Sequence, residues 1–292
     1  RNAFRSVCLK MMRQYGVAFF KFDGMGAGCN VSGAQRELAN DIDSVLALTG
    51  ELRQQRPDLF ISATVGTWPS PYWTFYADSI WRQGADTEFH GPGNGREQWI
   101  TYRDMSACQR IVRRAPLYPL NSLMLHGPCI GDRANPSRMD RDEASVAHEM
   151  WTFFGSGTGL QELYISPHLL TGGMWDTLAC AARWSRENAD VLADAHWIGG
   201  DPGAGEVYGF ASWSPRKGIV VLRNPSETPA SYDLNLARDF ELPREYLTDY
   251  QLESPRPGQR IGSLRMGANE QKRIELEPFE VLVFEATPVA RP

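Results

Sequence analysis

The sequence predicts an α/β fold built from parallel βα units, followed by a smaller antiparallel β-sandwich. In the first two-thirds of the 292 residues, short apolar runs alternate with longer amphipathic stretches, which is the pattern of parallel strands joined by helices. After about residue 197 the chain changes to short segments of alternating polarity, separated by turn-forming residues. We therefore expect two domains, residues 1–196 and residues 197–292.

The elements of the first domain follow from the spacing of apolar residues. A helix over 3–14 precedes a buried strand over 16–22, and Ser32 with Gln35 forms the capping pair of a helix over 32–54. The further elements expected are strands at 59–65, 85–89, 117–125 and 159–165, and helices at 72–83, 97–114, 140–154 and 174–195. This alternation fits both a (β/α)₈ barrel and a doubly wound sheet. In both folds ligands bind at the carboxyl ends of the strands.

The second domain is predicted from six short segments whose residues alternate in polarity. They lie at 206–213, 218–222, 230–236, 246–252, 272–276 and 280–285. Turn-forming residues separate them, including Asn224-Pro225 and the stretches 255–258 and 267–269. Short strands with such turns are typical of an antiparallel sandwich.

Composition excludes several classes of function. The formal net charge is −5 and the pI about 5.6, which argues against a nucleic-acid partner. No apolar run approaches the ~18 residues of a membrane span.

The glycine stretch 24–28 reads G-x-G-x-G, not the G-x-G-x-x-G of a dinucleotide-binding loop. The five cysteines are too widely spaced for a disulfide framework or a zinc site with close ligand pairs, and we expect buried or free thiols; they are Cys8, Cys29, Cys108, Cys129 and Cys180. We expect neither a metal nor a cofactor.

The first candidate catalytic feature is Lys21 with Asp23 at the end of the apolar run 16–22. Lysine is rare in this chain, with four lysines against 26 arginines, so its place here stands out. Residues two apart on a strand point to the same face, so the ammonium group can keep the carboxylate ionised. A strand-end ion pair without a catalytic role fits the residues as well.

The second feature is Arg82 with Asp86, which we expect at or inside the strand 85–89. The two aspartates are 63 positions apart, about two βα units, so they would follow next-but-one strands and could face each other across a barrel mouth. Retaining glycosidases hold two carboxyl groups ~5–5.5 Å apart, one as nucleophile and one as acid/base. The alternative for Asp86 is a helix cap or a surface carboxylate.

These residues resemble the motifs of a known family. Lys21-Phe22-Asp23 fits the K-x-D nucleophile motif of the clan D glycoside hydrolases, the superfamily of α-galactosidases and α-N-acetylgalactosaminidases. The stretch from Arg82 to Asp86 fits the R-x-x-x-D acid/base motif of that clan. The segments 95–104 (GREQWITYRD) and 118–127 (YPLNSLMLHG) look like bacterial members of the α-galactosidase-like branch. The resemblance covers nearly the whole chain, the C-terminal β-sandwich included.

The resemblance implies a (β/α)₈ TIM barrel in which Asp23 ends strand four and Asp86 lies on strand six. The visible strands are then strands four to eight. It also implies a double displacement, in which Asp23 attacks the anomeric carbon while Asp86 protonates the leaving oxygen and later deprotonates water. In this scheme Lys21 supports the ionised nucleophile, and Arg82 grips a sugar hydroxyl.

Further candidates for sugar binding are aromatic and histidine side chains near strand ends. Trp68 and Trp81 offer aromatic faces that suit sugar rings, and His90 and His126 follow strands and could hydrogen-bond a sugar. Each of them could equally serve in core packing. Weaker candidates of the same kind are Trp73, Glu88, Asn94 and Glu162.

The function expected first is a retaining α-glycosidase that removes terminal α-linked galactose or N-acetylgalactosamine from an oligosaccharide or glycoconjugate. The alternatives are an α-galactosyl transferase using the same residues and a non-catalytic carbohydrate-binding or incomplete fragment; a dinucleotide-dependent enzyme is a remote one. A full barrel takes ~250 residues. By the resemblance, strands one to three have no counterpart here, and neither do the sugar-binding carboxylates of strands one and two. We therefore expect either a missing N-terminal barrel segment or a second chain. The compartment stays undecided, with an extracytoplasmic one slightly favoured.

Overall fold

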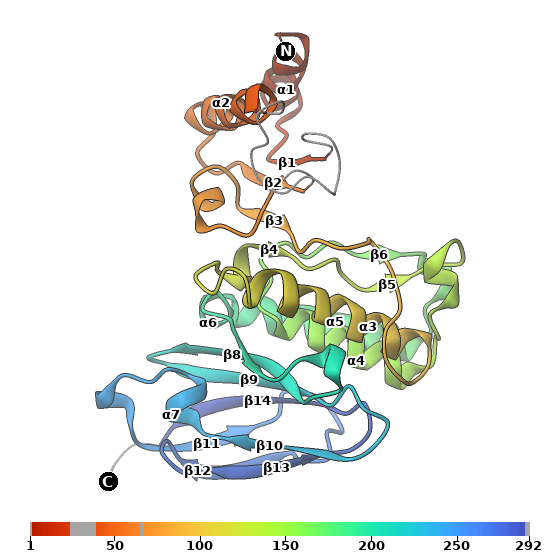
Figure 1. Ribbon diagram of the computed structural model, residues 1–292, viewed down its shortest axis with the longest axis vertical. Helices are drawn as coiled ribbons and strands as arrows, with labels where there is room; N and C mark the ends of the chain where they lie inside the picture. The colour runs from red at the N-terminus through yellow and green to blue at the C-terminus, as the bar shows by residue number, and fades with distance from the viewer. Residues whose placement is uncertain (1, 24–38, 65–66, 290–292) are drawn as a thin grey trace.

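The computed structural model describes residues 2–23, 39–64 and 67–289. The chain runs from N-terminal helices through parallel strands and a layer of helices to antiparallel sheets at the C-terminal end (Figure 1). Some sequence features lie outside the described residues, namely the glycine stretch 24–28, Cys29 and the capping pair Ser32 and Gln35.

The parallel strands form two sheets. In the first, the strands pair in chain order and are β1 (Phe19–Phe22), β2 (Phe60–Ala63), β3 (Ser79–Trp81) and β4 (Leu123–Met124). In the second, β5 (Cys129–Ile130) pairs with β6 (Tyr164–Ile165). Strands of successive βα units therefore lie side by side, which confirms the parallel α/β prediction. Within the described residues β1, β4, β5 and β6 each pair with one neighbour, and closure into a barrel remains a prediction.

Among the residues described, the α-helices of this part are α1 (Asn2–Tyr15), α2 (Ala39–Gln55), α3 (Gly95–Ala107), α4 (Glu143–Gly155), α5 (Gly172–Glu187) and the short α6 (Ala189–Leu192). Side-chain oxygens of Asn94, Asp142 and Thr171 accept hydrogen bonds from the first backbone amides of α3, α4 and α5. These caps explain why each helix begins where it does. A π-helical turn, Cys108–Val112, extends α3 and brings it close to the predicted helix 97–114.

The C-terminal part consists of antiparallel strands. A six-stranded sheet has the order β12-β11-β14-β9-β8-β7, and its strands are β7 (His196–Gly199), β8 (Tyr208–Ser214), β9 (Lys217–Arg223), β11 (Asp249–Glu253), β12 (Ser263–Gly267) and β14 (Val281–Pro288). A second sheet pairs β10 (Ala230–Leu234) with β13 (Lys272–Leu276). Both sheets contribute to one apolar core, in which Leu234 and Ile274 join Leu222, Leu252 and Phe284.

Several predicted elements differ from those observed. In place of a helix at 72–83 and a strand at 85–89, the chain forms a 3₁₀ helix, Pro71–Phe75, and then β3. Ser79 and Ile80 are fully buried between β2 and β4, and a three-residue strand is too short to show a period of two. Strands β5, β7 and β12 escaped prediction, and the predicted strands 117–125 and 159–165 shrink to two-residue strands.

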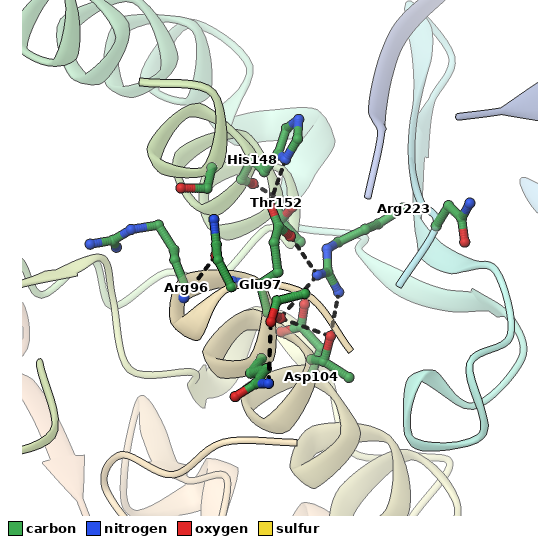
Figure 2. Close-up of polar contacts among 12 residues, drawn as sticks. Arg96, Glu97, Asp104, His148, Thr152 and Arg223 are labelled. Atoms are coloured by element: carbon green, nitrogen blue, oxygen red, sulfur yellow. Dashed lines mark hydrogen bonds and ion pairs between the residues drawn. The ribbon is translucent and has the colours of Figure 1, made fainter. Parts of the chain in front are cut away.

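A buried polar network joins helices α3 and α4 to the antiparallel sheet (Figure 2). Arg223, on β9, donates to one carboxylate oxygen of Glu97 at 2.8 Å, and His148, on α4, contacts the other at 2.7 Å. Tyr208, on β8, donates to a carboxylate oxygen of Asp104 at 2.5 Å. We call Glu97, Asp104, His148, Tyr208 and Arg223 the helix–sheet network.

Helix α4 also packs tightly on the sheet. A Cβ atom on Gly155 would lie 2.5 Å from Val221, so only glycine allows this approach of α4 to β9. No helix among the described residues is long and apolar enough to cross a membrane. Within the same residues, no group of three or more histidine, cysteine, aspartate or glutamate side chains gathers as metal ligands do.

Candidate active site

The two candidate catalytic aspartates lie at the same edge of the four-stranded sheet. Its strands are parallel and pair in chain order, so their carboxyl ends meet there. Asp23 directly follows β1, Asp86 lies in the loop after β3, and β2 lies between those strands, as the spacing of 63 residues predicted. Asp23 Oδ1 accepts a hydrogen bond from the hydroxyl of Thr64 at 2.9 Å. Both aspartates are exposed and therefore accessible to a ligand.

Lys21 makes its hydrogen bonds with residues in and just before β6. Its ammonium nitrogen donates to Glu162 Oε2 at 3.2 Å and to the hydroxyl oxygen of Tyr164 at 3.3 Å. The Tyr164 hydroxyl in turn donates to the same Glu162 oxygen at 2.5 Å. These contacts make Lys21, Glu162 and Tyr164 one hydrogen-bonded group. The contact between Lys21 and Asp23 remains a prediction.

His126 lies against this group in an uncommon backbone conformation, with φ of 75°. Its ring stacks on the ring of Tyr164 at 4.3 Å and meets Trp81 edge-on at 5.4 Å. Among the described residues, Nδ1 has no hydrogen-bond partner. Burial, aided by the charges of Arg82 and Lys21, lowers the pKa of His126 to about 3, so the imidazole is neutral at physiological pH. We call Lys21, Trp81, His126, Glu162 and Tyr164 the strand-end cluster.

Asp86 acts electrostatically on this cluster. Burial raises the pKa of Tyr164 well above its usual range, and the negative charges of Glu162 and Asp86 raise it further. The Tyr164 hydroxyl therefore keeps its proton and serves as a hydrogen-bond donor.

Arg82 has a different position from the one expected for a sugar ligand. Its guanidinium group is fully buried and donates to four backbone carbonyl oxygens, those of Leu125, Gln83, Ala85 and Asp86, at 2.8–3.0 Å. Burial lowers the pKa of Arg82 to about 10, so the side chain is still a cation at neutral pH. Arg82 thus fixes the loop that carries Asp86. Direct contact with a sugar would require this loop to move, and it remains a prediction.

Two other predicted residues have separate surroundings. The Trp68 ring packs edge-on against Trp73 at 4.9 Å and contacts the main core. His90 is exposed, and its Nε2 lies 3.0 Å from the carbonyl oxygen of Gly203 in the C-terminal part. The structure therefore groups Trp81 and His126 with Lys21, while Trp68 and His90 make other contacts.

Sequence reasoning missed Tyr164 and ranked Glu162 only as a weaker candidate. A signal was present, because Glu162 and Tyr164 are two residues apart in the predicted strand 159–165, the same spacing as Lys21 and Asp23. In the structure Lys21 lies near the carboxyl end of β1, whereas Glu162 precedes β6 and Tyr164 begins it.

No family model matches this sequence, and no curated protein matches it. Solved structures do match. An α-galactosidase of glycoside hydrolase family 36 from Geobacillus stearothermophilus, solved with raffinose, has a TM-score of 0.64, 12% identity, and coverage of 99% of this chain and 38% of its own. A putative α-N-acetylgalactosaminidase from Bacillus halodurans has a TM-score of 0.60, 16% identity, and coverage of 98% and 62%.

In fold, the chain resembles the clan D α-galactosidases. An α-amylase from Geobacillus thermoleovorans also matches, with a TM-score of 0.57, 10% identity, and coverage of 99% of this chain and 64% of its own. At 10–16% identity these likenesses concern the fold. The chain spans 38% and 62% of the lengths of the first two relatives, so the activity of the whole protein is a matter for proposal.

Proposed function

We propose that the edge of the four-stranded sheet where Asp23 and Asp86 lie is the active site of a retaining α-glycosidase. The enzyme would remove terminal α-linked galactose or N-acetylgalactosamine. One observation carries the proposal: the aspartates of the K-x-D and R-x-x-x-D motifs follow parallel strands that have a single strand between them. We further propose that residues from about 197 onward form a separate β-sandwich domain.

In the proposed reaction Asp23 is the nucleophile. Its carboxylate attacks the anomeric carbon while Asp86 gives a proton to the leaving glycosidic oxygen, and a covalent glycosyl-enzyme forms. Asp86, now ionised, then removes a proton from water, which attacks the same carbon and releases Asp23. Two inversions leave the sugar with its original α configuration.

The surroundings of the aspartates support this assignment. Arg82 holds the backbone of Asp86 in place, which favours a fixed distance between the acid/base and the bound sugar. Of the aromatic rings in the strand-end cluster, that of Tyr164 is 37% exposed, and aromatic faces suit the apolar face of a pyranose.

The test is hydrolysis of an activated aryl α-galactoside by the full chain and by Asp23→Asn. We expect kcat/KM to fall by on the order of 10⁴-fold, as loss of a nucleophile does elsewhere. Azide should restore turnover and yield the β-galactosyl azide, because the anion enters from the face that Asp23 vacates. Asp176→Asn, an exposed carboxylate on α5, is the matched control and should behave as the unmodified chain.

The same assay assigns the second carboxylate. With Asp86→Asn, an activated leaving group still departs, and azide attacks the glycosyl-enzyme to give the α-galactosyl azide. Equal activity of Asp23→Asn and the control would refute the assignment of the nucleophile. Adding sugar acceptors to the assay tests the alternative of α-galactosyl transfer.

A non-catalytic role has one observation in its favour, which is that the chain spans only part of the α-galactosidase relatives. That alternative predicts saturable binding of galactose without turnover of any aryl α-galactoside.

A further inference from the structure

Only one of the two carboxylate oxygens of Glu162 accepts hydrogen bonds from the described residues. Oε2 accepts hydrogen bonds from Lys21 and Tyr164, whereas Oε1 accepts none among the described residues. The side chain is 20% exposed and that of Lys21 29% exposed, so both can reach a ligand. Lys21 uses two acceptors, Glu162 and Tyr164, and its ammonium group has a third N–H to give.

The other partly buried lysine–glutamate pair shows what a structural pair looks like. Lys217 donates to Glu285 Oε2 at 2.8 Å. Glu285 Oε1 accepts from the indole of Trp184 at 2.8 Å and from Asn188 at 3.0 Å. Both oxygens of Glu285 thus have protein partners, in contrast to those of Glu162.

Aromatic rings lie beside the carboxylate of Glu162; that of Tyr164 is 37% exposed, whereas Trp81 and His126 are buried. The ring of Tyr164, whose hydroxyl binds Glu162, stacks on His126, and Trp81 closes the other side of His126. The left-handed backbone of His126 and its unpartnered Nδ1 are costly features, and such features gather at functional sites. Charge, free hydrogen-bonding positions and an apolar face therefore meet at one place.

We propose that Glu162 is a specificity-determining residue, which accepts a hydrogen bond from one hydroxyl of the terminal sugar while Lys21 donates to the neighbouring hydroxyl. The ligand class is a pyranose with two adjacent free hydroxyls, whose apolar face lies against Tyr164. The inference rests on the proposed function and adds a third carboxylate to its site. Tyr164 acts through Glu162, because its hydroxyl orients the carboxylate, and is a positioning residue.

The test measures binding of methyl α-galactoside, and of its four deoxy analogues at carbons 2, 3, 4 and 6, to the full chain by calorimetry. Glu162→Gln should bind methyl α-galactoside roughly 10- to 100-fold more weakly, the loss that follows removal of a charged hydrogen-bond partner. One deoxy analogue should bind the unmodified chain more weakly than methyl α-galactoside does, by a similar factor. The affinity for that analogue should fall little further in Glu162→Gln, because the hydrogen bond is already absent.

Two further variants separate recognition from stability. Glu285→Gln, the matched control, should lower the unfolding midpoint and leave sugar affinity unchanged. Glu162→Gln should lower sugar affinity and leave the unfolding midpoint unchanged. Tyr164→Phe keeps the ring and should weaken binding less than Glu162→Gln does.

The outcomes distinguish this inference from the proposed function. If the unmodified chain binds and cleaves α-galactosides and Glu162→Gln binds them equally well, the inference is overturned while the function stands. An equal loss in Glu162→Gln for all four deoxy analogues also overturns it, since that pattern indicates a distorted site. If no sugar binds the unmodified chain, the proposed function fails and the inference with it.

Discussion

The helix–sheet network and the strand-end cluster are made of similar groups and differ in exposure. Each contains a histidine, a tyrosine, a carboxylate and a cation. The ion-paired side chains of Arg223 and Glu97 are 0% and 4% exposed, against 29% and 20% for Lys21 and Glu162. Buried, paired charges join helices to the sheet, and removing one partner is costly. Paired charges that are partly exposed contribute little to stability and remain available to a ligand.

The two histidines make the same contrast. His148, in the network, contacts a carboxylate oxygen of Glu97 at 2.7 Å. His126, in the cluster, stacks on Tyr164, and its buried Nδ1 has no partner among the described residues. Arg223 Nε in the network is also buried without a partner among the described residues, so the difference between the two regions lies in the exposure of Lys21 and Glu162.

The largest expected effect is the loss of stability when the helix–sheet network is broken. Arg223→Leu leaves the carboxylate of Glu97 buried without its cation, and we expect the free energy of unfolding to fall by about 3–5 kcal/mol. Urea denaturation followed by fluorescence measures this loss. Sugar affinity of the molecules that remain folded should be unchanged, because the network and the cluster share no residue.

The control is Arg265→Leu, which removes an ion pair with Asp249 whose side chains are 58% and 55% exposed. It should change the free energy of unfolding by less than about 1 kcal/mol. A similar loss in both variants would contradict the assignment of the network as the structural element.

The second prediction uses pH to separate the two regions. The pKa of His126 is about 3 in the folded chain and ~6.5 when unfolded, so between these values the unfolded state binds more protons. Stability is therefore greatest above pH 6.5 and falls on acidification, by up to ~1.4 kcal/mol for each pH unit. Asparagine tolerates positive φ, so His126→Asn should fold and show a shallower slope between pH 7 and 5.

The network responds at lower pH. Burial opposes ionisation of Glu97, but the hydrogen bond to His148 and the charge of Arg223 prevail and lower its pKa. Its contribution is present above the usual pKa of ~4.3 and is lost as pH falls through the lower folded value. Equal slopes for His126→Asn and the unmodified chain between pH 7 and 5 would refute the contribution of the cluster.

Much of this architecture is legible in the sequence, because parallel strands alternate with capped helices and polar residues follow the strands. The parallel pairing of successive strands follows from that alternation, whereas β3 lies inside a predicted helix and Asp86 lies in the loop after β3, outside any strand. The contact between Lys21 and Glu162 joins residues 141 positions apart and comes from tertiary packing, which no local pattern encodes. The burial of Arg82 is of the same kind, since its partners are backbone carbonyls.

The smallest expected effect concerns the loop between Arg82 and Asp86. Gly84 has φ of +86°, and a Cβ atom there would lie 2.9 Å from the hydroxyl oxygen of Tyr102. Gly84→Ala should therefore lower the free energy of unfolding by about 1–2 kcal/mol. Because Arg82 binds the carbonyl of Asp86 across this turn, the proposed acid/base moves with it, and kcat/KM on an aryl α-galactoside should fall as well.

The matched control for this loop is Gly50→Ala, in the interior of α2, where a Cβ atom meets nothing within 4 Å. There alanine should raise the free energy of unfolding by about 0.5–1 kcal/mol and leave kcat/KM unchanged. If Gly84→Ala loses stability but keeps full activity, the loop belongs with the structural elements of the molecule, and Arg82 does not position the acid/base. If activity falls by more than the loss of folded protein explains, the loop belongs to the site. In that case the geometry at Asp86, rather than the folded fraction, limits the rate.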